Sequence, residues 1–232
     1  MNHSKKVTVL YFTDLLCIWA YISQIRIEKL KQRFATQIDI QPHFISVFGA
    51  VESKMKDNWG DKGGVSAYAE FIQQTVSKFD HIEVHPDLWQ KNRPTTSINV
   101  HLLLKSIQIL ETRNEIEANN EGNQSLFEQL AWALRVAFFR DLKDISNQRT
   151  QMEIIEELGL PQNKIRAVIE GGAAFAELEK DLQLKEKYAV IGSPSLVLNE
   201  GRQIIYGNVG YRVIEANIQE LLNQPDNQAS WC

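Results

Sequence analysis

Short apolar runs lie near both ends of the chain, and the long stretch between them repeats its apolar positions with a helical period. Residues 7–12 are β-branched or aromatic with one leucine, which is typical of a buried strand. A helical pattern covers residues 18–34. Residues 38–47 then predict a second strand, in which Pro42 indicates a sheet edge or a bulge. The N-terminal part therefore predicts a strand–helix–strand unit.

The middle of the chain, from about residue 53 to residue 188, predicts helices. Thr95 or Thr96 is expected to cap the second of them, which begins after Pro94. The predicted helices cover residues 65–79, 95–111, 125–142, 147–158, 164–170 and 173–187.

The last part of the chain returns to strands. Residues 195–198 and 202–206 flank an Asn-Glu-Gly turn and predict a β-hairpin, and residues 213–222 predict a final amphipathic helix. A βαβ unit and a ββα unit can join in one mixed sheet, with the intervening helices packed as a subdomain. The expected fold class is thus α/β.

Composition and charge fit a soluble globular protein. Apolar residues make up 44 % of the 232 residues, and charged residues make up 23 %. The net charge of −4 gives no overall attraction to nucleic acid or to an anionic membrane. We expect neither an export signal nor a membrane span, and we predict a cytoplasmic protein.

Two cysteines, Cys17 and Cys232, are too few for a disulfide framework or a four-cysteine zinc site. Cys17 lies where the first predicted strand ends and the first helix begins. The positive end of a helix dipole favours a thiolate there and lowers the thiol pKa. Cys17 is alternatively a small buried apolar residue, since unpaired cysteines are commonly buried. Cys232 ends a polar tail, and we expect it to be solvated.

Two further features bear on chemistry. Ser193-Pro194 precedes the predicted hairpin, where a cis peptide bond and the missing proline N–H suit an incoming peptide. The histidines have no metal-ligand spacing apart from His81 and His85, which lack a third ligand, so we predict no metal site.

Together, Asp14-Leu15-Leu16-Cys17-Ile18-Trp19-Ala20 and Gly192-Ser193-Pro194-Ser195-Leu196-Val197 resemble the DsbA-like branch of the thioredoxin superfamily. The FrnE-type members and the 2-hydroxychromene-2-carboxylate isomerase relatives are the most similar, and their opening pattern is Asp-x-x-Cys-Pro-Trp-Cys. The resemblance spans nearly the whole chain. It implies a thioredoxin-like fold formed by residues 1–52 and 188–224, a helical insertion at 53–187 and a flexible tail at 225–232.

The resemblance also implies a site. Cys17 takes the place of the nucleophile and Pro194 that of a cis-proline beside it, while Trp19, Ser193 and Asp14 are expected to contact substrate. The chain departs from the family at Ala20, which replaces the second cysteine, and at Ile18, which replaces the proline. A mixed disulfide at Cys17 therefore has no resolving thiol within the motif.

Three functions remain open at this point. The first is a monothiol disulfide oxidoreductase that acts on a disulfide-containing protein or small molecule, with a second substrate thiol, glutathione or Cys232 as the resolving thiol. The second is a glutathione-dependent isomerase or transferase of a small aromatic substrate. The third is a non-catalytic binding or chaperone module. We favour the first, with no tightly bound cofactor, glutathione as a co-substrate and a homodimer as a possible assembly.

Overall fold

The computed structural model describes residues 6–116 and 124–223. These residues fall into two compact units. One, here called the sheet unit, comprises the described residues of Met1–Thr13, Trp19–Ile45 and Asp181–Cys232. The other, the helical unit, comprises the described residues of Asp14–Ile18 and Ser46–Lys180. The domain boundaries implied by the resemblance stay a prediction, and the tail at 225–232 with Cys232 lies outside the described residues.

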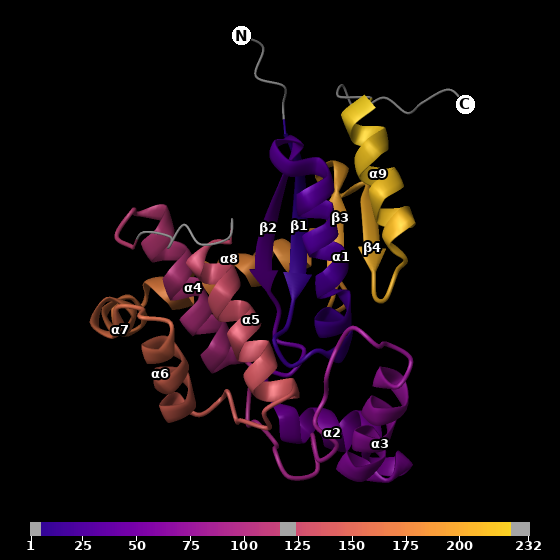
Figure 1. Ribbon diagram of the computed structural model, residues 1–232, viewed down its shortest axis with the longest axis vertical. Coiled ribbons are helices and arrows are strands. Elements are labelled where there is room, and N and C mark those ends of the chain that lie inside the picture. Colours follow the sequence, from indigo (N-terminus) through magenta and orange to yellow (C-terminus); the bar gives the residue numbers. More distant parts are fainter. Residues whose placement is uncertain (1–5, 117–123, 224–232) are drawn as a thin grey trace. The chain divides into compact units, whose positions relative to one another are not determined.

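The sheet has four strands in the order β2-β1-β3-β4 (Figure 1). β1 (Val7–Thr13) pairs in parallel with β2 (Ile38–Phe44), and α1 (Ile18–Phe34) is the crossover that a parallel pair requires. β3 (Ser195–Leu198) runs antiparallel to β1, and β4 (Gln203–Tyr206) forms the hairpin with β3. β2 lies at an edge, where Pro42 removes no hydrogen bond from a central strand.

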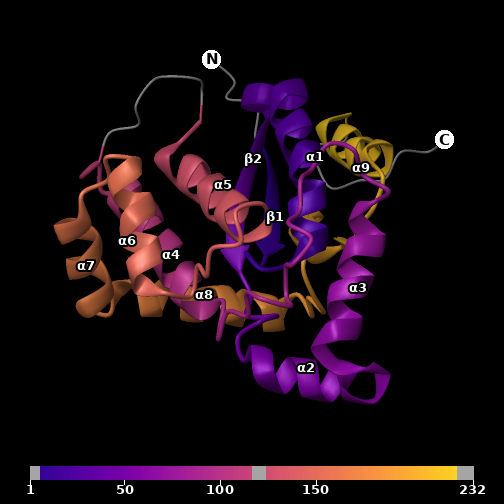
Figure 2. The same cartoon turned by 60° about the horizontal axis from the view of Figure 1, so that its bottom comes forward.

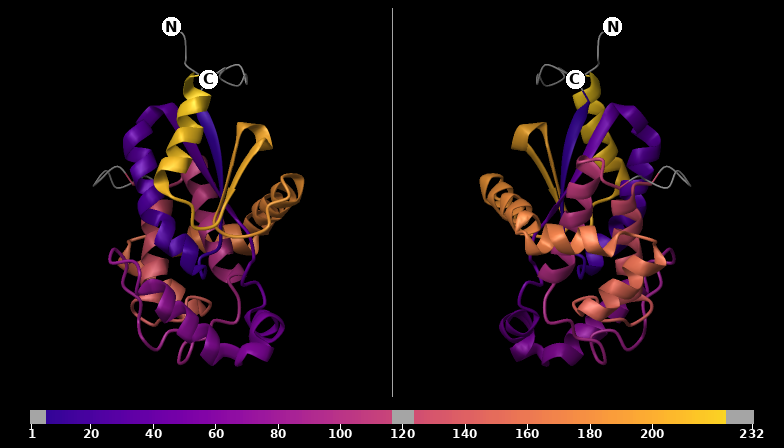
Figure 3. Two further views of the ribbon diagram at one scale, coloured as in Figure 1. Left: turned by 90° about the vertical axis from the view of Figure 1, so that its right-hand side faces the viewer. Right: turned by 90° about the vertical axis from the view of Figure 1, so that its left-hand side faces the viewer.

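Alternation along the strands gives the sheet two buried faces. α1 and α9 (Tyr211–Asn223) cover one face, and the C-terminal part of α8 (Ala173–Lys187) covers the other (Figure 3). The core under α1 and α9 contains ten buried apolar residues: Val9, Tyr11, Ile27, Leu30, Phe34, Ile38, Leu196, Leu198, Ile214 and Ile218.

On the opposite face, a buried carboxylate of α8 bonds to the edge strand β2. Phe12 stacks on His43 with ring centroids 5.2 Å apart. Asp181 on α8 lies 2.7 Å from Nδ1 of His43, and its other carboxylate oxygen accepts the N–H of Phe44 at 2.6 Å. Asp181 is 2 % exposed, so these bonds replace the solvation that the carboxylate loses on burial. The pair fastens α8 to the edge strand.

The helical unit is built around α4, which packs against α5 and α7; α2 and α3 pack against each other (Figure 2). Its helices are α2 (Val51–Trp59), α3 (Gly64–Val76), α4 (Ile98–Thr112), α5 (Leu126–Phe139), α6 (Gln148–Glu157) and α7 (Gln162–Glu170). Short 3-10 turns occupy Ala35–Gln37, Gly60–Lys62 and Asn199–Gly201.

Helix starts in this unit differ in how they are capped. Ser125 and Glu128 form a capping box on α5, and Asn147 caps α6, because each side chain accepts a backbone N–H of the first turn. The prediction that Thr95 or Thr96 is the N-cap of α4 was wrong. The N-cap is Ser97, whose hydroxyl makes a tertiary bond described below.

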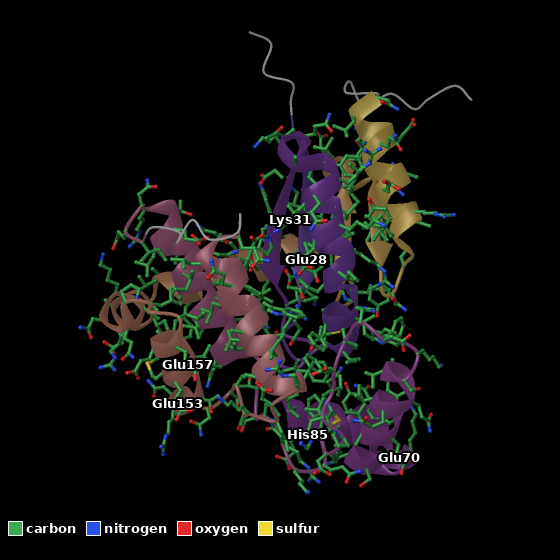
Figure 4. The ribbon with its side chains drawn as sticks, viewed as in Figure 1. Glu28, Lys31, Glu70, His85, Glu153 and Glu157 are labelled. Atoms are coloured by element: carbon green, nitrogen blue, oxygen red, sulfur yellow. The ribbon has the colours of Figure 1, made fainter. Side chains whose placement is uncertain are left out.

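Polar positions of the outer helices face solvent. Glu153 and Glu157 on α6 are exposed, as expected for the charged residues of that stretch (Figure 4). None of the helices that the structure describes is long and apolar enough to cross a membrane.

Candidate active site around Cys17

The segment Asp14–Ile18 connects β1 to α1 and belongs to the helical unit. It forms a tight turn, in which the Cys17 N–H donates to the Asp14 carbonyl oxygen at 3.1 Å. The Leu16 N–H donates to Oδ1 of Asp14 at 2.9 Å. Cys17 directly precedes the first residue of α1 and is 5 % exposed. The backbone around the sulfur is thus fixed by local hydrogen bonds.

Asp14 is fully buried and accepts several hydrogen bonds around this turn. Its Oδ2 accepts the Phe48 N–H at 2.9 Å and the Ser97 hydroxyl at 2.8 Å. The carboxylate therefore joins the turn to the start of α4 and to the loop before α2. Asp14 caps the turn that precedes α1, because the helix itself begins only at Ile18.

His101 on α4 completes the surroundings of the turn and is fully buried. Its Nε2 accepts the N–H of Leu15 at 3.4 Å and lies 3.7 Å from Oδ1 of Asp14. His101 therefore packs against the turn and connects it to α4.

An aromatic cluster lies in the same unit. The rings of Phe48 and Trp89 stack 5.4 Å apart, and Tyr68 meets Trp89 edge-on at 5.2 Å and Trp59 at 5.1 Å. Burial raises the pKa of Tyr68, and the nearby charges of Cys17 and Asp14 raise it further. Tyr68 therefore stays a neutral phenol beside the Cys17 turn. Trp89 is fully buried, so it packs in the core of the unit.

The sheet unit carries the other predicted residues. The Ser193–Pro194 peptide bond is cis, as the resemblance implied. The carbonyl of Pro194 accepts the Gly207 N–H at 2.8 Å, and the Ser195 hydroxyl donates to the carbonyl of Gly192 at 2.7 Å. Trp19 is half-buried in the first turn of α1. That these residues lie beside Cys17 and contact substrate stays a prediction.

Three residues that surround the Cys17 turn carry no motif in the sequence: Ser97, His101 and Tyr68. Ser97 bonds to Asp14 and His101 to Leu15, in each case across more than 80 residues of chain. Tyr68 lies on a helix face with no motif around it. Within residues 6–116 and 124–223, no three His, Cys, Asp or Glu side chains gather where they could hold a metal ion.

Comparison with protein families decides the classification. The model of the DSBA-like thioredoxin domain matches residues 8–219, which is most of the chain. The chain belongs to this family. Its four-stranded mixed sheet and the helices between β2 and β3 are the DsbA-like form of the thioredoxin fold. No curated protein sequence matches the chain significantly.

Solved structures share the fold over their whole length. A putative protein disulfide isomerase from Nitrosomonas europaea has a TM-score of 0.70 at 13 % identity, with 95 % of this chain and 99 % of that chain covered. The cytosolic disulfide reductase DsbM from Pseudomonas aeruginosa has a TM-score of 0.61 at 18 % identity, with 91 % and 98 % covered. A 2-hydroxychromene-2-carboxylate isomerase has a TM-score of 0.60 at 14 % identity, with 96 % and 100 % covered. At these identities the likeness concerns the fold alone.

Proposed function

We propose that the protein is a monothiol disulfide oxidoreductase in which Cys17 is the nucleophile and an external thiol completes the reaction. The observation that carries the proposal is the motif itself. A DSBA-like chain keeps a cysteine directly before α1, and Ala20 stands where the family has its second cysteine. A site of this composition can open a disulfide but cannot close one within its own motif.

The reaction balances with glutathione as the external thiol. The Cys17 thiolate attacks a mixed disulfide R–S–S–G, a bond forms between Cys17 and the glutathione sulfur, and R–S⁻ leaves and takes up a proton. A glutathione thiolate then attacks the glutathione sulfur of this adduct, oxidised glutathione leaves, and the Cys17 thiolate is restored. The net change is the two-electron reduction of R–S–S–G by one further glutathione.

Glutathione is the thiol we favour for a chemical reason and by analogy. Resolution needs an abundant small thiol, because only 5 % of Cys17 is exposed and a globular partner has little access. One structural relative, the reductase DsbM, has also been solved with GSH. That this chain acts in the cytoplasm is part of the same proposal, since DsbM is a cytosolic enzyme by its description.

In this proposal the buried Asp14 holds the turn and does not react. One of its three accepted hydrogen bonds fixes the Leu16 N–H next to Cys17, and the other two connect the turn to Phe48 and Ser97. Pro194 and Ser193 are assigned to the peptide or glutathione backbone of the substrate, on the basis of the family resemblance.

The test is the steady-state reduction of a glutathionylated peptide by glutathione. We expect Cys17→Ser to lose the enzyme-dependent rate and Cys232→Ser to keep it. Equal rates for the wild type and Cys17→Ser would overturn the proposal. Loss of the rate in Cys232→Ser with Cys17 intact would replace the external thiol by Cys232.

Ala20→Cys gives a second, independent check. A cysteine at this position restores the family's pair, so that a mixed disulfide at Cys17 is released without added thiol. We expect the variant to release glutathione in a single turnover with no thiol present, whereas the wild type holds it. A wild type that also releases it would contradict the monothiol scheme.

A glutathione-dependent isomerase or transferase is the second candidate, because the replaced cysteine leaves a single sulfur that can hydrogen-bond a glutathione thiolate. Glutathione binding, measured by thermal shift, is shared with the first candidate. The two differ in the reaction of Cys17: the isomerase forms no covalent adduct with glutathione.

A further inference from the structure

A cavity of about 490 Å³ lies in the helical unit between α2, the start of α3 and the loop that leads to α4. Small-molecule sites in proteins measure roughly 300–1,000 Å³. Its lining includes the apolar side chains of Val51, Met55, Val65, Trp89 and Pro94. Cys17 is not among the lining residues, so the cavity is separate from the sulfur.

Two features hold the walls of the cavity in place. The Val51 N–H donates to the carbonyl of Thr95 at 3.2 Å, which ties α2 to the loop. Trp89 is fully buried and has a positive φ of 68°, and its ring is held by Phe48, which stacks on it, and by Tyr68, which meets it edge-on. Its indole N–H has no hydrogen-bond partner among the residues that the structure describes.

The rim carries more positive than negative charge. Lys56 and Arg93 line the cavity together with one acidic residue, Glu52. Neither cation has an ion-pair partner in the described part of the chain. Nε of Arg93 donates to the carbonyl of Trp89 at 3.1 Å, so the guanidinium is anchored at the rim while its two terminal nitrogens stay available. Such a group suits a carboxylate, which it can bind with two parallel hydrogen bonds.

We propose that this cavity binds a small organic anion: an apolar body against Val51, Met55, Val65 and Trp89, with a carboxylate at Arg93 and Lys56. An inorganic anion does not fit this cavity, because it would make no contact with the apolar side chains that line it. The two cations favour an acid over a neutral compound of the same shape.

The probe is 2-naphthoate, titrated calorimetrically into the full chain, with the neutral 2-naphthamide and with acetate as matched comparisons. We expect naphthoate to bind at least about tenfold more tightly than the amide, and acetate not to bind at millimolar concentration. Equal binding of naphthoate and naphthamide, or no binding of naphthoate, would overturn the proposal.

Charge variants locate the anion. Arg93→Gln and Lys56→Gln are each expected to weaken naphthoate binding about two- to fivefold, and Glu52→Gln to strengthen it. Lys54→Gln is the matched control, because Lys54 lies on the same helix but stacks over Phe48 and does not line the cavity. Equal affinities in all four variants would place the ligand elsewhere.

A thiol-independent measurement separates this site from the proposed catalysis. Cys17→Ser should bind naphthoate like the wild type. Naphthoate binding that fails while Cys17-dependent turnover persists refutes the cavity alone, and the reverse result refutes the disulfide chemistry alone. Binding that disappears in Cys17→Ser would contradict the separation of the two sites.

Discussion

Replacement of Asp14 by asparagine tests whether the buried carboxylate holds the Cys17 turn. Asp14 accepts three hydrogen bonds, from the N–H groups of Leu16 and Phe48 and from the hydroxyl of Ser97. An amide keeps one acceptor oxygen and turns its NH₂ group toward at least one of these donors. A hydrogen bond to a charged acceptor contributes about 1.5–3 kcal/mol, and a buried donor left without a partner costs about 1–3 kcal/mol.

We therefore expect Asp14→Asn to lower the free energy of unfolding by about 2–4 kcal/mol. Urea unfolding followed by far-ultraviolet circular dichroism measures this, and the midpoint should fall by about 1 M. Asp39→Asn is the matched control, because Asp39 is exposed and accepts a hydrogen bond from exposed Gln41. A loss for Asp14→Asn within about 0.5 kcal/mol of the control would refute the reasoning.

A double-mutant cycle with Ser97→Ala identifies the interaction. The Ser97 hydroxyl donates to Oδ2 of Asp14, which also accepts the Phe48 N–H. Asp14→Asn and Ser97→Ala therefore each remove the same Ser97–Asp14 hydrogen bond. We expect the double variant to be more stable than the sum of the single losses predicts, by about 0.5–1.5 kcal/mol. Additive losses would mean that Asp14 and Ser97 act separately.

Three further predictions concern stability. Because the pKa of Tyr68 is raised in the folded protein, the unfolded state loses the phenol proton first, and the free energy of unfolding falls above pH 10 by about 1.4 kcal/mol per pH unit. Tyr68→Phe should lessen this fall. If urea unfolding at pH 9 and pH 11 shows the same loss of stability for the wild type and the variant, the prediction is wrong. Gly201→Ala should be more destabilising than Gly207→Ala by about 1–3 kcal/mol in thermal unfolding. Both glycines have positive φ, but of the two only Gly201 would place a Cβ 2.6 Å from the ring of Tyr188. Equal losses of stability would show that the tyrosine ring moves aside without cost. Asp181→Ala should lower the free energy of unfolding in urea by about 2–4 kcal/mol, because the buried Phe44 N–H loses its acceptor. A decrease below about 0.5 kcal/mol would show that water replaces the carboxylate.

Local sequence patterns predicted the bounds of α1 and α8 well. The crossover helix was expected at residues 18–34 and is observed at Ile18–Phe34, because a strand-type run ends abruptly before it and its apolar positions keep a helical period. α8 was likewise expected at 173–187, since Gly171-Gly172 separates it from α7. These boundaries depend on local chemistry, which a single sequence contains.

Predictions failed where tertiary contacts decide. α2 (Val51–Trp59) was not predicted as a separate helix, because its two buried residues, Val51 and Met55, are a single i, i+4 pair among polar neighbours. α4 begins three residues later than predicted, because Ser97 donates to Asp14 and the hydroxyl of Thr96 donates to the carbonyl of Gly49. Neither bond is visible in the sequence around Pro94.

The candidate site shows the same division. Cys17 and the cis bond before Pro194 follow from motifs at element ends. The surroundings of the Cys17 turn come from Ser97, His101 and Tyr68, which lie 51–84 residues from Cys17 along the chain. Only the folded helical unit places them together.

Mass spectrometry of the trapped enzyme tests the central claim most directly. Cys232→Ser protein is mixed with a glutathionylated peptide, quenched in acid, and analysed for a glutathione adduct on Cys17 before and after glutathione is added. The account predicts one glutathione per chain at Cys17, which disappears on addition of glutathione as oxidised glutathione forms. Turnover of the peptide with no adduct at Cys17 at any time would contradict it.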